Sequence, residues 1–255
     1  MMCFMRKYPM CAVLGVPVLL ASFSIALAQK TGQSESTKPQ VPPPADLSGF
    51  WLIHPSASAG AYSSFAFTKE SPPMTAWGEE KFKAAKPVFG PNKTTPKQSN
   101  DPVYGCFPPG LPRIYLHPKP IEIVQLPDEL IMMYEYDRIV RHIYIDGRPH
   151  DEFLDPPLWM GDSIGKWEGD TLVIDVIGFN DKTWLDRAGH PHSDSLHVTE
   201  RLRRVNHDTL SDEITIEDPK AYTKPWTAQI GFQLQPGLTL DWEGVCEQAK
   251  MADRQ

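Results

Sequence analysis

The chain has 255 residues, a formal net charge of −7 and 41% hydrophobic residues. This acidic balance argues against a nucleic-acid partner, because polyanions are held by clustered Lys and Arg side chains. The densest basic run, at 201–204, places Arg201 and Arg203 on the same face of an extended segment, which is typical of a solvated strand surface.

The first 28 residues have the organisation of a secretory signal. Arg6 and Lys7 precede an almost entirely apolar stretch at 11–27, and the segment ends in Ala-Leu-Ala, the small residues that a signal peptidase requires. We expect a signal peptide over 1–28, cleavage near Gln29, and a soluble periplasmic or secreted product without a membrane span. An uncleaved membrane anchor is the alternative. Cleavage removes two basic and no acidic residues, so the net charge falls from −7 to −9.

The remainder of the chain predicts a leader and one domain. Residues 29–45 are polar and include three consecutive prolines, which indicates a disordered Pro-rich leader. From 46 to 255 apolar residues recur without another linker, and we expect a single β-rich domain. After export this part keeps two cysteines, Cys106 and Cys246, and an oxidising compartment favours a disulfide between them.

One helix is predicted near the start of this domain. Thr75 is a suitable N-cap for a segment that continues to Lys86 and is ended by Pro87. The expected buried stripe of this helix is Trp77, Lys81, Ala84 and Ala85. Residues 87–120 hold many prolines and glycines, and they are predicted to form irregular covering loops.

After residue 120, short apolar segments alternate with turn sequences. The turns are Leu-Pro-Asp (126–128), Trp-Glu-Gly-Asp (167–170), Asn-His-Asp (206–208) and Gln-Pro-Gly (235–237). The predicted strands are 121–125, 129–136, 138–146, 162–166, 171–178, 197–205, 209–217, 226–234 and 238–246. Sequential hairpins form an antiparallel meander, which hides its edges by closing into a barrel or a strongly curled sheet. The predicted fold class is therefore mainly β, with one short helix and long irregular loops.

Two resemblances agree with this fold. Asp-Leu-Ser-Gly-Phe-Trp at 46–51, followed by a meander, resembles the Gly-x-Trp opening of lipocalin-like (calycin-like) barrels. From about residue 72 to 246 the chain resembles a family of exported bacterial proteins without an assigned activity. The motifs that carry this resemblance are Asp-Gly-Arg-Pro-His (146–150), Trp-Glu-Gly-Asp-Thr-Leu-Val (167–173), Gly-Phe-Asn-Asp (178–181), Gly-His-Pro-His-Ser (189–193), His-Val-Thr-Glu-Arg (197–201) and Tyr-Thr-Lys-Pro-Trp (222–226). The resemblance implies export and a β fold, and it transfers no catalytic residue.

The candidate site is the loop at 178–201, where ionisable side chains crowd between two predicted strands. His190 and His192 flank one proline, and alternate residues of an extended segment point the same way. They could hold a divalent metal such as zinc, iron or manganese, with a third ligand from His142 or His150. His197, five residues later, is predicted to bind the substrate. Glu200, on the opposite strand face, is predicted to belong to the catalytic group. Because the spacing matches no established metal motif, no metal ligand is assigned, and no nucleotide cofactor is indicated.

General acid and base catalysis is the alternative use of the same loop. His192 is the predicted base, assisted by Asp181 or Asp186, with His190 as a second polar group. The structural alternative is that the aspartates cap turns and the histidines bond the backbone. Arg141 or His142 is predicted to anchor a substrate.

Aromatic side chains provide the predicted binding surface. Tyr136 shares a strand face with Tyr134, and this mixture of polar and aromatic groups is typical of a pocket wall. Further aromatic residues that could stack on a ring or cover the barrel end are Trp159, Trp184, Tyr222 and Trp226. Two functions are expected from these features. One is an exported lyase, isomerase or hydrolase that acts on a small polar or aromatic molecule; the other is a lipocalin-like carrier of an apolar ligand.

Overall fold

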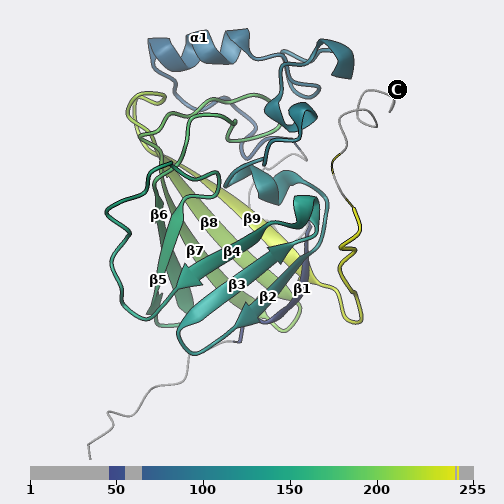
Figure 1. Cartoon of the computed structure of the whole chain (residues 1–255), viewed down its shortest axis with the longest axis vertical. Coiled ribbons are helices and arrows are strands. Elements are labelled where there is room, and N and C mark those ends of the chain that lie inside the picture. Colours follow the sequence, from purple (N-terminus) through teal and green to yellow (C-terminus); the bar gives the residue numbers. More distant parts are fainter. Residues whose placement is uncertain (1–45, 55–64, 245, 247–255) are drawn as a thin grey trace, which may run out of the picture. The chain divides into compact units, whose positions relative to one another are not determined.

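The computed structural model describes residues 46–54, 65–244 and 246. The predicted signal peptide (1–28) and leader (29–45) lie outside these residues. Within the described part, nine strands form one closed barrel (Figure 1). The strands are β1 (Gly49–Ile53), β2 (Ile121–Gln125), β3 (Glu129–Tyr134), β4 (Val140–Tyr144), β5 (Asp162–Glu168), β6 (Thr171–Ile177), β7 (His197–Asn206), β8 (Thr209–Glu217) and β9 (Trp226–Leu234).

The barrel is a meander in which each strand pairs with the next along the chain. It closes where β1 pairs with β9, with Trp51 opposite Leu234. All neighbours are antiparallel except β4 and β5, which run parallel and meet in one residue pair, Tyr144 with Ile164. A tight hairpin cannot join parallel strands, so residues 145–161 form a long connection. The mainly β barrel predicted from the sequence is confirmed, with this one parallel junction as a difference.

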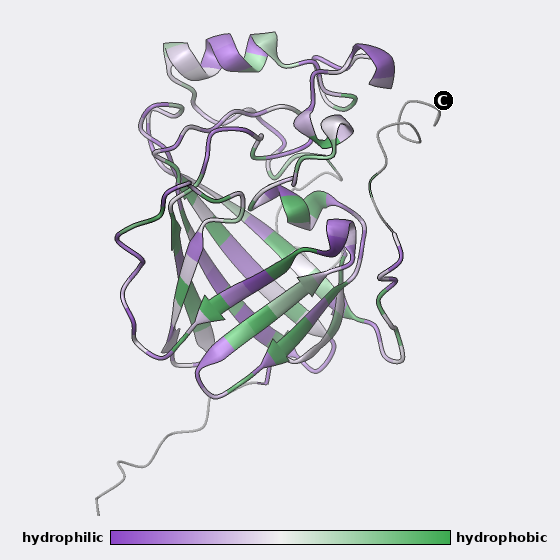
Figure 2. Cartoon of the chain, in the orientation of Figure 1, coloured by the Kyte–Doolittle hydropathy of each residue, from purple (hydrophilic) through white to green (hydrophobic). Residues whose placement is uncertain are grey.

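Alternation of apolar and polar residues places the core inside the barrel. Along β6 the buried side chains are Leu172, Ile174 and Val176, and the residues between them are partly exposed. Figure 2 shows the resulting alternation of hydrophobic and hydrophilic colour along several strands. The outer charges include Arg201 and Arg203, which are exposed and paired with acidic side chains of the outer surface. The predicted solvated basic face is therefore confirmed.

The helix α1 (Ala76–Ala84) is capped by Thr75, whose hydroxyl accepts a hydrogen bond from the Gly78 amide at 3.1 Å. The predicted helix is confirmed, but its predicted buried stripe is largely wrong. Gly78 and Phe82 are its buried residues. A Cβ atom at Gly78 would lie 2.3 Å from the carbonyl oxygen of Ala221, so the helix approaches the 218–222 segment through its glycine.

Residues 87–120 form loops with three short 3₁₀ turns, η2 (Pro96–Gln98), η3 (Pro102–Gly105) and η4 (Arg113–Leu116), as predicted. In Figure 1 these turns and α1 lie beyond one end of the barrel. Side chains of η4 are buried and join the barrel core, which they cover at this end. No helix among the described residues is long and apolar enough to cross a membrane.

The predicted strand at 238–246 does not form, because its described residues have no strand pairing. The edge of β9 that it would have joined is occupied by β1. The predicted disulfide between Cys106 and Cys246 is confirmed, and it closes a loop between residues 140 positions apart. It links η3 to the segment that follows the barrel.

Candidate functional site

The 178–201 loop contains a buried aspartate–histidine pair. Oδ2 of Asp186 lies 2.5 Å from Nδ1 of His190, while Oδ1 accepts hydrogen bonds from the amides of Ala188 and His190. The His190 ring stacks on Phe82 of α1 with centroids 4.5 Å apart. Asp186 therefore caps a turn, as the structural alternative expects, and it also orients the ring of His190.

His192 has different partners. Its Nδ1 lies 3.1 Å from the carbonyl oxygen of Ser193, and its buried Nε2 has no hydrogen-bond partner within the described part of the chain. Burial lowers the pKa of His192 below its ordinary value, although the Ser193 carbonyl and the charges of Asp218 and Asp181 oppose this. Asp181 is exposed, and Asp186 is engaged by His190. The structure therefore pairs Asp186 with His190 and not, as predicted, with His192.

The other histidines of the sequence analysis lie on the outer wall of the barrel. His150 bridges Asp162 of β5 and Asp175 of β6 at 2.7 and 2.9 Å, and His197 contacts the second oxygen of Asp175. Burial would lower the pKa of His150, but the hydrogen bonds with both carboxylates outweigh it and raise the pKa. His142 is partly exposed and lies 3.0 Å from Glu129 on the neighbouring strand.

These contacts separate the ionisable residues that were considered together for metal binding and catalysis. His190 and His192 belong to the covering loop, His197 belongs to the outer wall, and Glu200 is fully buried inside the barrel. Among the described residues, no group of three or more His, Cys, Asp or Glu side chains is arranged to hold a metal ion.

The predicted binding aromatics lie at separate places. Tyr222 is buried, donates to the Pro191 carbonyl at 2.8 Å, and contacts Trp226 edge to face. The Arg113 guanidinium lies over the Trp184 ring, with its central carbon 5.4 Å from the ring centroid. Tyr136 contacts His117 in a tilted arrangement with ring centroids 4.0 Å apart. Trp159 lines a cavity at the junction of β4 and β5 and a second cavity among the covering loops, both described below.

The barrel interior holds a buried ionic cluster. Arg141 of β4 donates from Nη2 to Glu200 of β7 at 2.5 Å, from Nη1 to the Tyr115 hydroxyl at 2.9 Å, and from Nε to Ser163 at 3.0 Å. The Arg141 and Glu200 side chains are 1% and 0% exposed. Burial would lower the pKa of Arg141, but the Glu200 carboxylate raises it well above its ordinary value. Arg141 is therefore a fixed cation inside the barrel, whereas His142, the alternative anchor, faces outward.

Asp212 of β8 completes this cluster. The pairing of Leu202 with Asp212 and of Glu200 with Ile214 makes the two acids diagonal neighbours on the inner surface. Asp212 is buried, and neither carboxyl oxygen has a hydrogen-bond partner among the described residues. Burial and the nearby Glu200 charge raise the pKa of Asp212 well above its ordinary value, which favours the protonated form of this acid. The sequence analysis missed Asp212 and Tyr115.

The junction of β4 and β5 contains a cavity of about 420 Å³. Because these strands meet only at Tyr144 and Ile164, the barrel wall is open beside that pair. Arg141 and Ser163, two members of the interior cluster, belong to the lining. The other lining residues are Pro108, Ile139, Val140, His142, Tyr144, Leu158, Trp159, Met160, Gly161 and Asp162.

Exposed apolar side chains surround this opening. Val140 and Leu158 are 47% and 40% exposed. Phe107, which is 51% exposed, stacks on Trp159 with ring centroids 5.5 Å apart. Phe107 and Trp159 also line an adjacent cavity of about 550 Å³. Clustered exposed apolar residues mark binding surfaces more often than singly scattered ones do.

The burial of His117, which contacts Tyr136, predicts how the free energy of unfolding changes with pH. Burial and the charges of Arg113 and Arg187 lower the pKa of His117 from 6.5 to about 2. Between these values the unfolded chain binds a proton that the folded chain does not, so stability falls as the pH decreases. We expect the wild type to lose about 2–3 kcal/mol more than His117→Phe between about pH 6.5 and 4.5. Urea unfolding at both pH values measures this difference, and parallel losses in the two proteins would contradict it.

Comparisons with protein-family models and with curated proteins found no match. A comparison with solved structures found similarity to the crystal structure of the fluorescent protein UnaG N57A mutant. The two chains are 13% identical, the match covers 74% of this chain and 96% of that chain, and the TM-score is 0.32. The barrel assignment given above therefore depends on the strand pairing of this chain itself.

Proposed function

We propose that this protein is a carrier that binds a small, largely apolar molecule at the β4–β5 opening without transforming it. The observation that carries the proposal is the cavity of about 420 Å³ at the one incomplete junction of the barrel, with Arg141 and Ser163 in its lining. Cavities of this size that combine apolar walls with a few fixed polar groups are typical of small-molecule sites.

The charges of the interior cluster favour an uncharged ligand. Arg141 is neutralised by Glu200, and burial together with the Glu200 charge disfavours the ionised form of Asp212. A charged ligand group would therefore find no unpaired opposite charge in this cluster. A hydroxyl, carbonyl or amide group could bond Ser163, while Val140, Leu158 and Trp159 contact the apolar part.

Binding of N-phenyl-1-naphthylamine, an uncharged aromatic fluorophore, tests this site. We expect the mature protein to enhance its fluorescence, and we expect Trp159→Ala to weaken the affinity about tenfold, because truncating a central aromatic residue of a site commonly costs 1–2 kcal/mol. Fluorescence titration measures both affinities.

Trp242→Ala is the matched control, since Trp242 is 39% exposed and lines none of the cavities described above. Val140→Asp separates the two cavities that share Trp159, because Val140 lines only the one at the β4–β5 junction. Wild-type affinity in both Trp159→Ala and Val140→Asp would rule out the proposed site.

A second candidate is the acid and base enzyme predicted from the 178–201 loop. The Asp186–His190 pair supports it, because a carboxylate bonded to Nδ1 leaves Nε2 as the reactive nitrogen of the ring. This candidate exchanges the roles predicted from the sequence: His190 is the base, and His192 is the second polar group. Substrate access argues against this candidate, because Nε2 of both histidines is buried.

Recovery of the natural ligand distinguishes the carrier from the enzyme. Organic extracts of the purified protein would be incubated with fresh wild-type protein and with His190→Gln, and then analysed by mass spectrometry. A carrier returns the extracted compound unchanged from both incubations. Conversion by the wild type and not by His190→Gln would establish the enzyme instead.

A further inference from the structure

The connection between β4 and β5, residues 145–161, forms part of the wall of the proposed binding site. Leu158 and Trp159 of this connection line the β4–β5 cavity, and so does Asp162, the residue that follows it. Near its end the connection is bonded to the barrel through the Leu158 amide, which donates to the Gly178 carbonyl at 2.8 Å. The position of the connection therefore affects the shape of the cavity.

His150 attaches the earlier part of this connection to the barrel wall. Its Nδ1 lies 2.7 Å from Oδ2 of Asp162 in β5, and its Nε2 lies 2.9 Å from Oδ2 of Asp175 in β6. The Asp151 amide donates to the same Asp162 oxygen at 3.1 Å. Within the described part of the chain, these three are the hydrogen bonds that join residues 146–157 to a strand. We call His150, Asp162 and Asp175 the clasp.

Both bonds of His150 exist together only when its ring carries a proton on each nitrogen. A neutral imidazole has one N–H and an imidazolium has two, whereas an ionised carboxylate only accepts. Burial alone would lower the pKa of His150, but the hydrogen bonds with Asp175 and Asp162 raise it above its ordinary value of 6.5. The clasp is therefore complete below pH 6.5 and is lost as the pH rises through the pKa of the folded protein.

The charged groups around the clasp come from the neighbouring strands and from the connection itself. Asp175 contacts Nε2 of His197 in β7 through its second oxygen, and Nδ1 of His197 lies 3.5 Å from Glu217 in β8. Burial would raise the pKa of Asp175, but the hydrogen bonds from its two histidine partners lower it, so Asp175 stays an acceptor. Arg148 of the connection is paired with Asp146 at 2.7 Å. The other charged residues of the connection are exposed acids, Asp151, Glu152 and Asp155.

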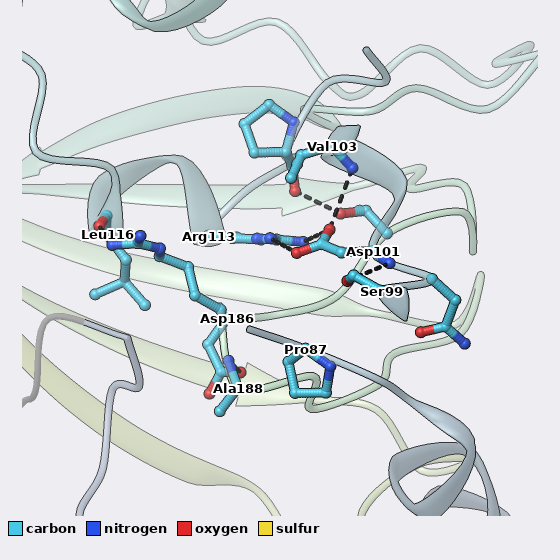
Figure 3. A network of polar contacts seen from close by, with 12 residues as sticks. Pro87, Ser99, Asp101, Val103, Arg113, Leu116, Asp186 and Ala188 are labelled. Atoms are coloured by element: carbon cyan, nitrogen blue, oxygen red, sulfur yellow. Dashed lines mark hydrogen bonds and ion pairs between the residues drawn. The ribbon is translucent and has the colours of Figure 1, made fainter. Parts of the chain in front are cut away.

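Another part of the cavity lining is anchored independently of the clasp. Pro108 of this lining lies between Asp101 and Arg113, whose side chains are joined by hydrogen bonds of 2.9 and 2.5 Å (Figure 3). Both side chains are buried, and Asp101 also accepts from the Val103 amide at 3.1 Å. Loss of the clasp therefore changes the connection side of the cavity while the Pro108 side stays in place.

We propose that protonation of His150 controls ligand binding at the β4–β5 opening, an inference that rests on the proposed carrier site. With the clasp complete, the connection is held against the barrel, and the imidazolium offsets the charge of Asp162 in the cavity lining. A neutral ring releases the connection and leaves the Asp162 charge without that partner. An apolar ligand then binds less tightly, because it buries a carboxylate that is no longer paired.

Titration with the uncharged fluorophore N-phenyl-1-naphthylamine tests the proposal. We expect the affinity of the mature wild type to fall about three- to fivefold between about pH 6 and about pH 9, which matches the modest energy of a partly exposed ion pair. The midpoint of this fall should coincide with the loss of a ring proton from His150, followed by nitrogen-15 NMR of the histidine side chains. Constant affinity, or a midpoint that differs from that of His150, would overturn the proposal.

Three variants identify the group that titrates. His150→Gln has no charge, and we expect it to bind the fluorophore at every pH as weakly as the wild type does at high pH. His142→Gln is the critical comparison, because His142 lines the same cavity and lies 3.0 Å from Glu129. We expect His142→Gln to keep the pH dependence; a pH dependence that is lost there and kept in His150→Gln would overturn the proposal. His207→Gln, at an exposed histidine beside Asp208 in the β7–β8 turn, should match the wild type.

The ring spectrum of wild-type His150 decides the clasp without any ligand, even if His150→Gln fails to fold. We expect this ring to titrate above the ordinary value of 6.5, and titration at or below that value would refute the clasp. If the fluorophore binds at no pH while His150 titrates as expected, the carrier site fails, and control of that site fails with it. Binding that is independent of pH refutes the control alone and leaves the carrier site standing.

Discussion

Arg141→Met is expected to lower the free energy of unfolding by about 3–5 kcal/mol at neutral pH. The variant removes the charged partner of Glu200, a carboxylate that is 0% exposed and bonded to Arg141 through both oxygens. The hydrogen bond that remains, donated by the Tyr115 hydroxyl at 2.6 Å, supplies no positive charge. Asp212 cannot replace that partner, because it is itself an acid in the same apolar interior. Guanidinium unfolding followed by tryptophan fluorescence measures the loss.

Two further variants identify the cause of this loss. Arg141→Met/Glu200→Leu removes both charges, and we expect it to recover most of the stability, because an apolar pair of similar volume replaces a desolvated ion pair at little cost. Arg201→Gln breaks an exposed ion pair with Glu168 and should change stability by less than about 1 kcal/mol. A double variant as unstable as Arg141→Met would show that packing, and not the unpaired Glu200 charge, causes the loss.

The strands were predictable because two sequence signals, the turn sequences and the alternation of apolar and polar residues, indicate the same strand bounds along the second half of the chain. The predicted strands 209–217 and 226–234 have the bounds of β8 and β9. The Trp-Glu-Gly-Asp turn is formed between β5 and β6, with Gly169 at φ 64°. Glycine adopts this left-handed conformation more readily than residues with a Cβ atom, so the local sequence favours the turn.

Long-range contacts were not predictable in the same way. The segment 238–246 has strand-like residues, but β1 already pairs with the edge of β9. The buried face of α1 depends on the close approach of Gly78 to Ala221. Hydrophobic periodicity does not predict this contact, because glycine has no apolar side chain. The parallel junction of β4 and β5 depends on the path of residues 145–161, and it creates the opening that carries the proposed function.

The sequence contained a signal for the interior cluster. Glu200 alternates with the apolar residues Val198 and Leu202, and Asp212 alternates with Leu210 and Ile214. An acid at such a position faces the core and requires a partner. A cavity of about 270 Å³ among the covering loops, lined in part by Arg113, Arg187 and His117, could not be predicted in this way. Irregular loops bring its residues together, and their sequence has no periodic pattern.

Removal of the Cys106–Cys246 disulfide is the second large effect that we expect. Its loop spans 140 residue positions, and chain-entropy arguments assign about 4–5 kcal/mol to a cross-link of this length. The segment after β9 has no strand pairing at 238–244, so the bond contributes mainly by restricting the unfolded chain and not by holding a strand in the barrel. Cys106→Ser/Cys246→Ser should therefore keep the far-ultraviolet circular dichroism of the wild type while unfolding at lower guanidinium concentration.

The same interpretation predicts how reduction acts on the native protein. Wild type unfolded in the presence of dithiothreitol should lose as much stability as the double serine variant, and dithiothreitol should not affect that variant. A reduced protein with altered circular dichroism before unfolding would indicate that the bond maintains native structure. An unchanged unfolding midpoint would mean that the unfolded chain gains little freedom when the bond is absent, which would exclude the chain-entropy account for this loop.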